Sequence, residues 1–161
     1  MKKWRNALLT AIAGGAGMAV VGTIAGLLTN VFTGGKAALT ESGGGWATYL
    51  FALLGSHAYA GFVWGLFYPR FAAEHKSWAV HGLLFGLGLF LAGLLPGVIL
   101  VDITLGLGGL LISTWGISSL LSALAGGLAT AYVFHILTHE AETTNSKDQM
   151  NTLLGRDKVS S

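Results

Sequence analysis

The stretch AVHGLLFGLGLFLAGLLPGVILV, residues 79–101, decides the fold because it runs for 23 residues without one Asp, Glu, Lys or Arg. A helix of about 20 apolar residues crosses the roughly 30 Å hydrocarbon core of a bilayer. Residues 7–32, 47–68 and 112–138 are equally free of these charged residues. The sequence therefore predicts an all-α membrane protein, with a four-transmembrane-helix bundle over residues 1–138.

The composition excludes an ordinary water-soluble domain. Hydrophobic residues make up 53% of the 161 residues and charged residues only 10%, whereas soluble domains carry about 25% charged residues. So few charges do not cover a water-facing surface. Cysteine is absent, which excludes a disulfide framework, a thiolate nucleophile and a thiolate metal site.

The basic residues predict the orientation. Eight of the nine Lys and Arg residues precede the first span, follow the second or follow the fourth, and only Lys36 lies elsewhere. Basic residues gather on the cytoplasmic side of membrane proteins. We therefore expect a multi-pass protein of the inner (plasma) membrane with both termini in the cytoplasm and no nucleic-acid partner. Residues 139–161 are polar and of mixed charge, which predicts a disordered cytoplasmic tail.

Three local features leave alternatives open. The start, MKKWRNALLTAIAGG, resembles a signal peptide, but the apolar run continues to Phe32, so a retained first span is favoured over a cleaved one. Pro96 predicts a kink or a frayed helix end. Residues 102–113 are read as an interfacial turn, a re-entrant segment or the start of a longer fourth helix, and the interfacial turn is favoured.

His57 lies within the second span, followed by Gly61 and Gly65 at four-residue intervals. Small residues at this spacing let helix backbones approach each other in lipid. We expect His57 to face the bundle and to bond a Ser or Thr of the fourth span or a carbonyl near Pro96. A packing role is favoured, and a contact to a ligand, a metal or a transferred proton is the alternative.

Three further residues are candidates for chemistry. Asp102 either joins His57 in a polar path or lies at the membrane interface, and the interface is favoured. His81 and His135 are placed near the cytoplasmic ends of the third and fourth spans, which suggests a heme b site with two histidine ligands. No other metal site is predicted. No catalytic motif occurs, so the chain is not predicted to be an enzyme.

The pattern His57-x3-Gly61-x2-Trp64-Gly65, followed by HGLLFGLGLFLAGLLP and a Gly/Ser-rich last span, resembles small uncharacterised bacterial inner-membrane proteins with four helices. The resemblance covers residues 47–135 and implies the four-helix fold but no activity, cofactor or catalytic residue.

Three functions are compatible with these patterns. The favoured one is a structural or accessory protein that packs as a homo-oligomer or with a larger membrane complex. The second is a small transporter or channel with a polar path at His57, and the third is a b-type heme electron carrier that uses His81 and His135. The sequence alone names no substrate.

Overall fold

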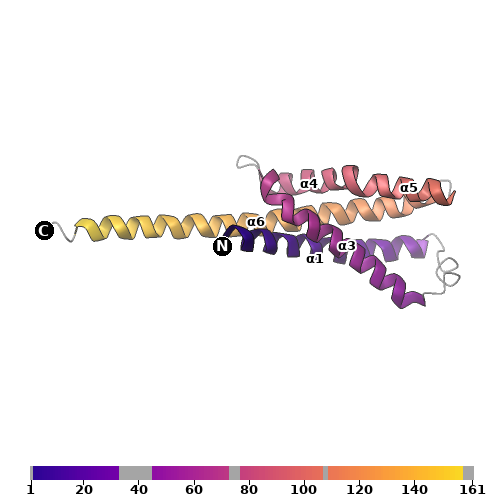
Figure 1. Ribbon diagram of the computed structural model, residues 1–161, viewed down its shortest axis with the longest axis horizontal. Coiled ribbons are helices and arrows are strands. Elements are labelled where there is room, and N and C mark those ends of the chain that lie inside the picture. The colour runs from indigo at the N-terminus through magenta and orange to yellow at the C-terminus, as the bar shows by residue number, and fades with distance from the viewer. Residues whose placement is uncertain (1, 33–44, 73–76, 107–108, 158–161) are drawn as a thin grey trace.

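The computed structural model describes residues 2–32, 45–72, 77–106 and 109–157, and the elements within these ranges are all helical (Figure 1). The helices are α1 (Lys2–Phe32), α3 (Gly45–Phe71), α4 (Trp78–Leu89), the π-helical turn η1 (Phe90–Leu94), α5 (Leu95–Leu105) and α6 (Leu110–Asp157). Because α4, η1 and α5 follow one another without a break, they form one rod. The all-α prediction is confirmed. Each predicted span falls largely within one of four helical rods, namely α1, α3, the α4–α5 rod and α6.

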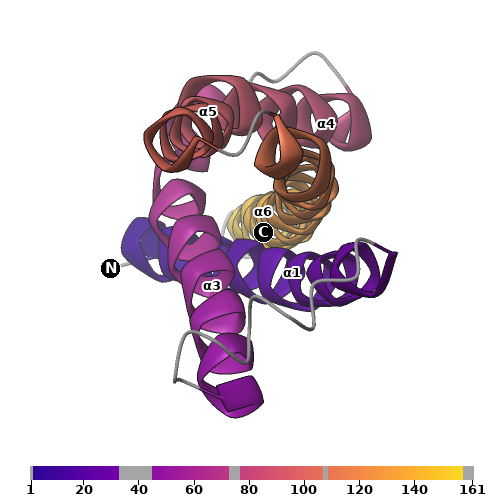
Figure 2. The same cartoon turned by 90° about the vertical axis from the view of Figure 1, so that its right-hand side faces the viewer.

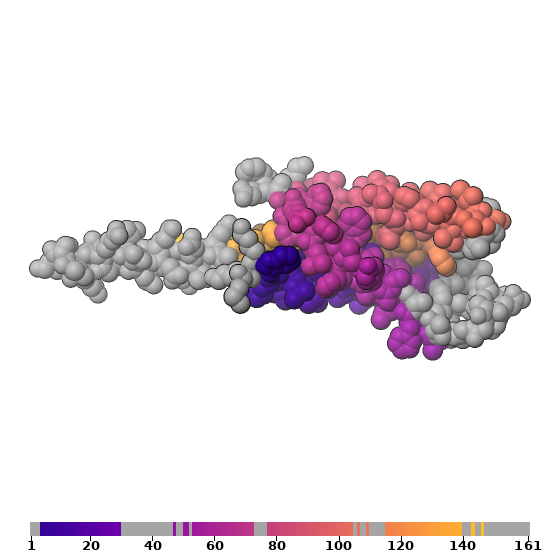
Figure 3. Space-filling model, in the orientation of Figure 1, coloured from indigo at the N-terminus to yellow at the C-terminus, as the bar shows by residue number. Residues whose placement is uncertain are grey.

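Three of the described rods are long and apolar enough to cross a membrane, over Trp4–Thr29, Trp78–Thr104 and Trp115–His139, and α3 is not among them. Large apolar side chains also cover the exterior. Examples are Val20, Ile24 and Leu28 of α1, Tyr59 and Phe67 of α3, and Leu84, Leu91 and Leu100 of the α4–α5 rod. Figure 3 shows α3 crossing between α1 and this rod on one face. The exterior is consistent with a helical membrane protein.

Helix α6 contacts every other rod, and α1 packs against both α3 and α6 (Figure 2). The α1–α3 contact is made by backbone, because a Cβ built on Gly61 would meet the carbonyl group of Gly14 and come within 2.9 Å of the Gly15 Cα. At the α1–α6 contact, the Ser122 hydroxyl of α6 donates to the Met18 carbonyl oxygen of α1 at 2.9 Å. Close backbone approach of this kind gains dispersion energy where lipid provides no hydrophobic drive.

The α4–α5 rod packs against α6 in the same way. A Cβ on Gly82 would lie 2.9 Å from the Gly127 oxygen, the Leu128 Cα and the Ala131 Cβ. Towards the start of α4, the rings of Trp78 and Tyr132 lie 5.3 Å apart. The two helices are therefore antiparallel. Since α1 also runs antiparallel to α6, α1 and the α4–α5 rod point the same way.

The helix continues past Pro96 and does not end or fray there. Proline has no N–H to donate and its ring crowds the preceding turn. The chain absorbs this with the π-helical turn η1, in which the Leu95 N–H donates to the Phe90 carbonyl oxygen. Helix α5 then runs on to Leu105. The proline thus changes the hydrogen-bond register and does not end the rod.

Most of the segment 102–113 is helical, because α5 runs to Leu105 and α6 begins at Leu110. Helix α5 is capped by Gly106 with φ of +65°, and Gly109 has φ of +88° directly before α6 begins. These left-handed values favour glycine, which has no Cβ to clash. Both neighbouring helices extend further into the segment than expected, so the turn is shorter than twelve residues.

The tail prediction differs from the structure, in which α6 continues as helix through Asp157 and extends beyond the rest of the molecule (Figure 1). Low hydrophobicity led to the expectation of disorder over 139–161. However, residues 139–157 contain no proline and only one glycine, the two residues that most disfavour a helix. Nothing in this segment ends a helix that α6 has already nucleated.

Candidate functional site

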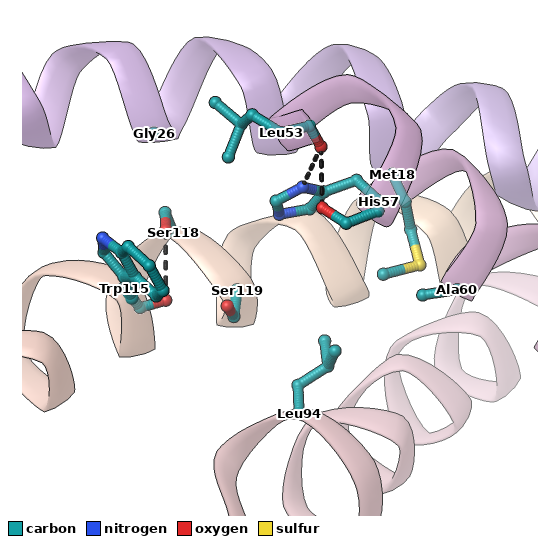
Figure 4. A pocket seen from close by; sticks show the side chains of 10 residues that line it. Met18, Gly26, Leu53, His57, Ala60, Leu94, Trp115, Ser118 and Ser119 are labelled. Carbon is teal, nitrogen blue, oxygen red and sulfur yellow. Dashed lines mark hydrogen bonds between the residues drawn. The ribbon is translucent and has the colours of Figure 1, made fainter. Parts of the chain in front are cut away.

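A cavity of about 390 Å³ lies where α3 leans away from the α4–α5 rod (Figure 4). Helix α3 packs mainly on α1. It makes fewer contacts with α6 and few with α4, so backbone does not close the space between α3 and these two helices. All four rods contribute to the lining. The lining residues are Met18, Gly26, Leu53, Ser56, His57, Ala60, Leu94, Trp115, Ser118 and Ser119.

His57 is half-buried and provides the only titratable side chain among these lining residues. Its Nδ1 lies 2.7 Å from the Leu53 carbonyl oxygen of the preceding helical turn. The ring also rests on α1, because a Cβ on Gly22 would come within 2.7 Å of the imidazole Cγ and Nε2. The expected partner on another helix is therefore replaced by a backbone carbonyl of α3 itself.

The Leu53 contact determines which nitrogen carries the hydrogen. A backbone carbonyl oxygen only accepts hydrogen bonds, so Nδ1 must donate. In neutral imidazole the other nitrogen, Nε2, then keeps its lone pair. Nε2 has no hydrogen-bond partner among the described residues, and Figure 4 shows this edge of the ring towards the space in front of α6.

Helix α6 provides the opposite wall with Trp115, Ser118 and Ser119. The Ser118 hydroxyl donates to the Trp115 carbonyl oxygen at 3.0 Å. Ser118 and Ser119 are 4% and 9% exposed, so their hydroxyls are sheltered from the exterior. Neither serine was among the predicted site residues, although a Ser-Ser pair within an apolar helix is a visible signal.

The cavity extends from the middle of the bundle towards one end. His57 is level with Gly22, which lies ten residues, or roughly 15 Å, before the end of α1 at Phe32. Ser118 lies eight residues, or roughly 12 Å, after the start of α6 at Leu110. The cavity thus reaches from mid-depth towards the end that carries the α5–α6 turn.

Gly61 and Gly65 lie outside the cavity and pack against α1. A Cβ on Gly65 would come within 2.6 Å of the Ala11 Cα and 3.0 Å of the Thr10 carbonyl oxygen. The Thr10 hydroxyl in turn lies 3.4 Å from the Gly65 carbonyl oxygen. These glycines fix the spacing between α3 and α1, and this spacing places the His57 ring on Gly22.

Asp102 is not brought together with His57. It is 4% exposed, and its Oδ2 accepts a hydrogen bond from the Gly109 N–H at 2.8 Å. The carboxylate therefore ties the end of α5 to the start of α6, where a helix N-terminus favours a negative group. Because Asp102 does not line the cavity, the described residues provide no polar path between the two.

His81 and His135 are offset along the bundle. Gly82 packs on Leu128 and Trp78 on Tyr132, so His81 is level with a residue near 129, and His135 lies about six residues, or roughly 9 Å, further along α6. The His135 ring contacts the His139 ring at 4.5 Å. His81 and His135 therefore lie at different depths, whereas the two-histidine heme site was predicted from equal depths. Among the described residues, no three His, Asp or Glu side chains are grouped to hold a metal ion.

His81 lies beside a second cavity of about 410 Å³, whose lining is mainly aromatic and includes Trp64, Tyr68, Phe71 and Phe85. The His81 Nε2 is buried and has no hydrogen-bond partner among the described residues. Since this atom is inaccessible, Nε2 of His81 is not open to a ligand. His57 is the better candidate.

No known protein family, no curated protein and no solved structure matches this chain.

Proposed function

We propose that this chain is a four-span protein of the inner membrane with both termini in the cytoplasm, and that its His57 cavity binds a small, mainly apolar molecule. Binding of a transported molecule is the first step that the transporter hypothesis for His57 requires. The cavity would then extend from the middle of the membrane towards the side that faces away from the cytoplasm.

The parallel directions of α1 and the α4–α5 rod support α3 as the fourth span. A chain that crosses in α1 must return before it crosses again in the same direction. Helix α3 has 27 residues, or roughly 40 Å of length, which is enough for a bilayer core of about 30 Å. The distribution of Lys and Arg supports the same orientation.

One observation carries the binding proposal: Nε2 of His57, which has no hydrogen-bond partner among the described residues, faces a mainly apolar cavity of about 390 Å³. Small-molecule sites typically measure 300–1,000 Å³ and combine an apolar lining with a few placed polar groups. Placing a histidine inside a bundle costs free energy unless its polar atoms are used. Only one of the two His57 nitrogens is used by the described protein atoms.

The packing role is less well supported as the main function. It rested on the glycine spacing, which predicts close helix contacts without saying whether the partner is the same chain or another. Gly14, Gly61, Gly82 and Gly86 all meet backbone of this same chain. These glycines are therefore occupied by the fold itself and give no separate reason for an oligomer or a complex.

A fluorescence experiment tests the binding proposal, because Trp115 lines the cavity. Trp4, Trp46, Trp64 and Trp78 are replaced by Phe, and bromobenzene, a heavy-atom quencher, is titrated into the detergent-solubilised protein. We expect a saturable quenching phase above the linear quenching that comes from partitioning into detergent. Ser119→Phe, which fills the cavity, is expected to abolish the saturable phase.

Ile117→Phe is the matched control, because Ile117 lies on the same helix but is 56% exposed and does not line the cavity. It is expected to keep the saturable phase. Purely linear quenching in the protein with a single tryptophan, or a saturable phase that survives Ser119→Phe, would overturn the binding proposal.

A further inference from the structure

We infer that the His57 cavity selects a neutral molecule with an O–H donor, such as a phenol or an alcohol, and that this donor bonds to Nε2 of His57. The inference rests on the proposed function, since it names the class of molecule that the cavity binds. It follows from which N–H and O–H hydrogens around the cavity are already used in hydrogen bonds within the protein.

His57 offers an acceptor and no donor. Its Nδ1–H is engaged with the Leu53 carbonyl oxygen at 2.7 Å. A neutral imidazole has only one N–H, so Nε2 presents a lone pair alone. A ligand with only acceptor oxygens gains nothing at this atom and forces two lone pairs together, whereas an O–H bonds to it directly.

Two of the three serines that line the cavity also use their hydroxyl hydrogens in hydrogen bonds within the protein. The Ser56 hydroxyl donates to the Leu53 carbonyl oxygen at 3.0 Å, and the Ser118 hydroxyl donates to the Trp115 carbonyl oxygen at 3.0 Å. Each hydroxyl has one hydrogen, so these oxygens now only accept. Ser119 is the lining serine with no hydrogen bond among the described atoms. The polar part of the cavity is thus richer in acceptors than in donors.

The lining also argues for a neutral ligand. No Asp, Glu, Lys or Arg is among the ten lining residues. An ammonium group would be an excellent donor, but burying its charge without a carboxylate is costly. A hydroxyl satisfies the acceptors without that cost.

The rest of the lining suits an apolar body. Met18, Leu53 and Leu94 present aliphatic or thioether groups from three different helices, and Ala60 adds a methyl group (Figure 4). A hydroxyl at one end of a compact apolar group is therefore the chemistry that fits. Phenols are convenient probes of it, because a methyl ether removes the donor and keeps the oxygen.

The test compares 4-bromophenol with 4-bromoanisole in the single-tryptophan protein, with both concentrations corrected for partitioning into detergent. A hydrogen bond with a net value near 1.4 kcal/mol corresponds to about tenfold in affinity. We therefore expect 4-bromophenol to saturate at about a tenfold lower concentration than 4-bromoanisole. In His57→Phe, which keeps a ring but has no acceptor, the two concentrations are expected to become equal, with 4-bromoanisole little changed.

The outcomes separate this inference from the proposed function. If neither compound gives saturable quenching, the cavity does not bind small molecules and both proposals are wrong. If both saturate at equal concentrations, or the phenol keeps its advantage in His57→Phe, binding stands and the donor inference is wrong. 4-Bromobenzylamine is a cation at neutral pH. If it binds more tightly than 4-bromophenol, the inference that the cavity selects a neutral molecule is wrong.

A second readout needs no ligand. The ¹⁵N NMR spectrum of histidine-labelled protein, with the His57 signals assigned by their loss in His57→Gln, distinguishes a ring protonated on Nδ1 from one protonated on Nε2. We expect the Nδ1–H form, and we expect the Nε2 signal to move when 4-bromophenol is added but not when 4-bromoanisole is added. An Nε2–H form in the free protein would overturn the inference.

Discussion

Single glycines in this chain differ in what occupies the place of the absent side chain. At Gly61, that place is taken by the carbonyl group of Gly14 and by the Gly15 Cα at 2.9 Å. At Gly97, no atom lies within 4 Å. Both residues lie within helices, so they form a matched pair in which only the surroundings differ.

This pair gives a stability prediction. We expect Gly61→Ala to lower the free energy of unfolding by about 1–3 kcal/mol, because backbone cannot move aside as a side chain can. Gly97→Ala is expected to be neutral or to stabilise by up to about 1 kcal/mol, because alanine favours a helix. Denaturant unfolding in detergent measures both. An unchanged midpoint for Gly61→Ala would contradict the close α1–α3 contact.

Asp102 gives a second prediction at the same scale. We expect Asp102→Ala to cost about 1–3 kcal/mol of stability, because it leaves the Gly109 N–H without its carboxylate acceptor. Asp102→Asn, which keeps an acceptor oxygen, is expected to cost less. Bromobenzene quenching of Trp115 should persist in both variants. Unchanged stability together with lost quenching would instead support a polar path through Asp102.

At the scale of helices, the sequence predicts the rods but not their pairing. Charge-free stretches as long as 79–101 are enough to predict spanning helices, because the bilayer fixes the required length. They do not say which helix lies in the centre, because lipid-facing and helix-facing residues are equally apolar. Gly14 and Gly15 lie at the α1–α3 contact, yet the pair Gly22 and Gly26, four residues apart, is equally prominent in the sequence.

The same limit applies to the site. A histidine on a packing helix was predictable from the spacing of His57, Gly61 and Gly65. Its partner was not, because a side chain can bond its own helix or a neighbour at similar free energy, and the choice depends on how far α3 leans from α6. The cavity has the same origin, so no pattern in one helix predicts it.

The register between α4 and α6 has a direct test, because the chain contains no cysteine and introduced thiols have no competitors. A Cβ on Gly82 would lie 2.9 Å from the Ala131 Cβ, so a separation of the two helices by about 1 Å brings the two atoms to the roughly 3.8 Å of a disulfide. We therefore expect Gly82→Cys combined with Ala131→Cys to cross-link under mild oxidation, as seen by intact mass. His81→Cys combined with His135→Cys is the control and should stay reduced, given the offset of roughly 9 Å along the axis.

The reverse result would place the two histidines side by side. Cross-linking of the 81–135 pair but not of the 82–131 pair would mean that α4 lies about six residues further along α6 than described. The heme hypothesis would then regain its geometric basis.

At the scale of the whole molecule, the directions of the rods and the distribution of charge support the same proposed topology. Helix α1 and the α4–α5 rod run the same way, and α6 runs against both. If α1 and the α4–α5 rod both cross a membrane, α3 has to carry the chain back between them. Helix α3 is nevertheless the rod that is not among the three apolar span candidates. The proposed four-span topology therefore depends on α3.

Reporter fusions decide the matter, because four-span and three-span chains differ at three of four positions. With four spans and a cytoplasmic N-terminus, fusions after residue 40 and near residue 108 read outside, and fusions near residue 73 and at the C-terminus read cytoplasmic. If α3 does not cross, residue 73 reads outside, residue 108 reads cytoplasmic and the C-terminus reads outside. We expect the first pattern, because Arg70 and Lys76 flank the connection near residue 73 and basic residues resist export. A C-terminal reporter that reads outside would leave α1 and the α4–α5 rod pointing in opposite directions, which contradicts the packing of both against α6.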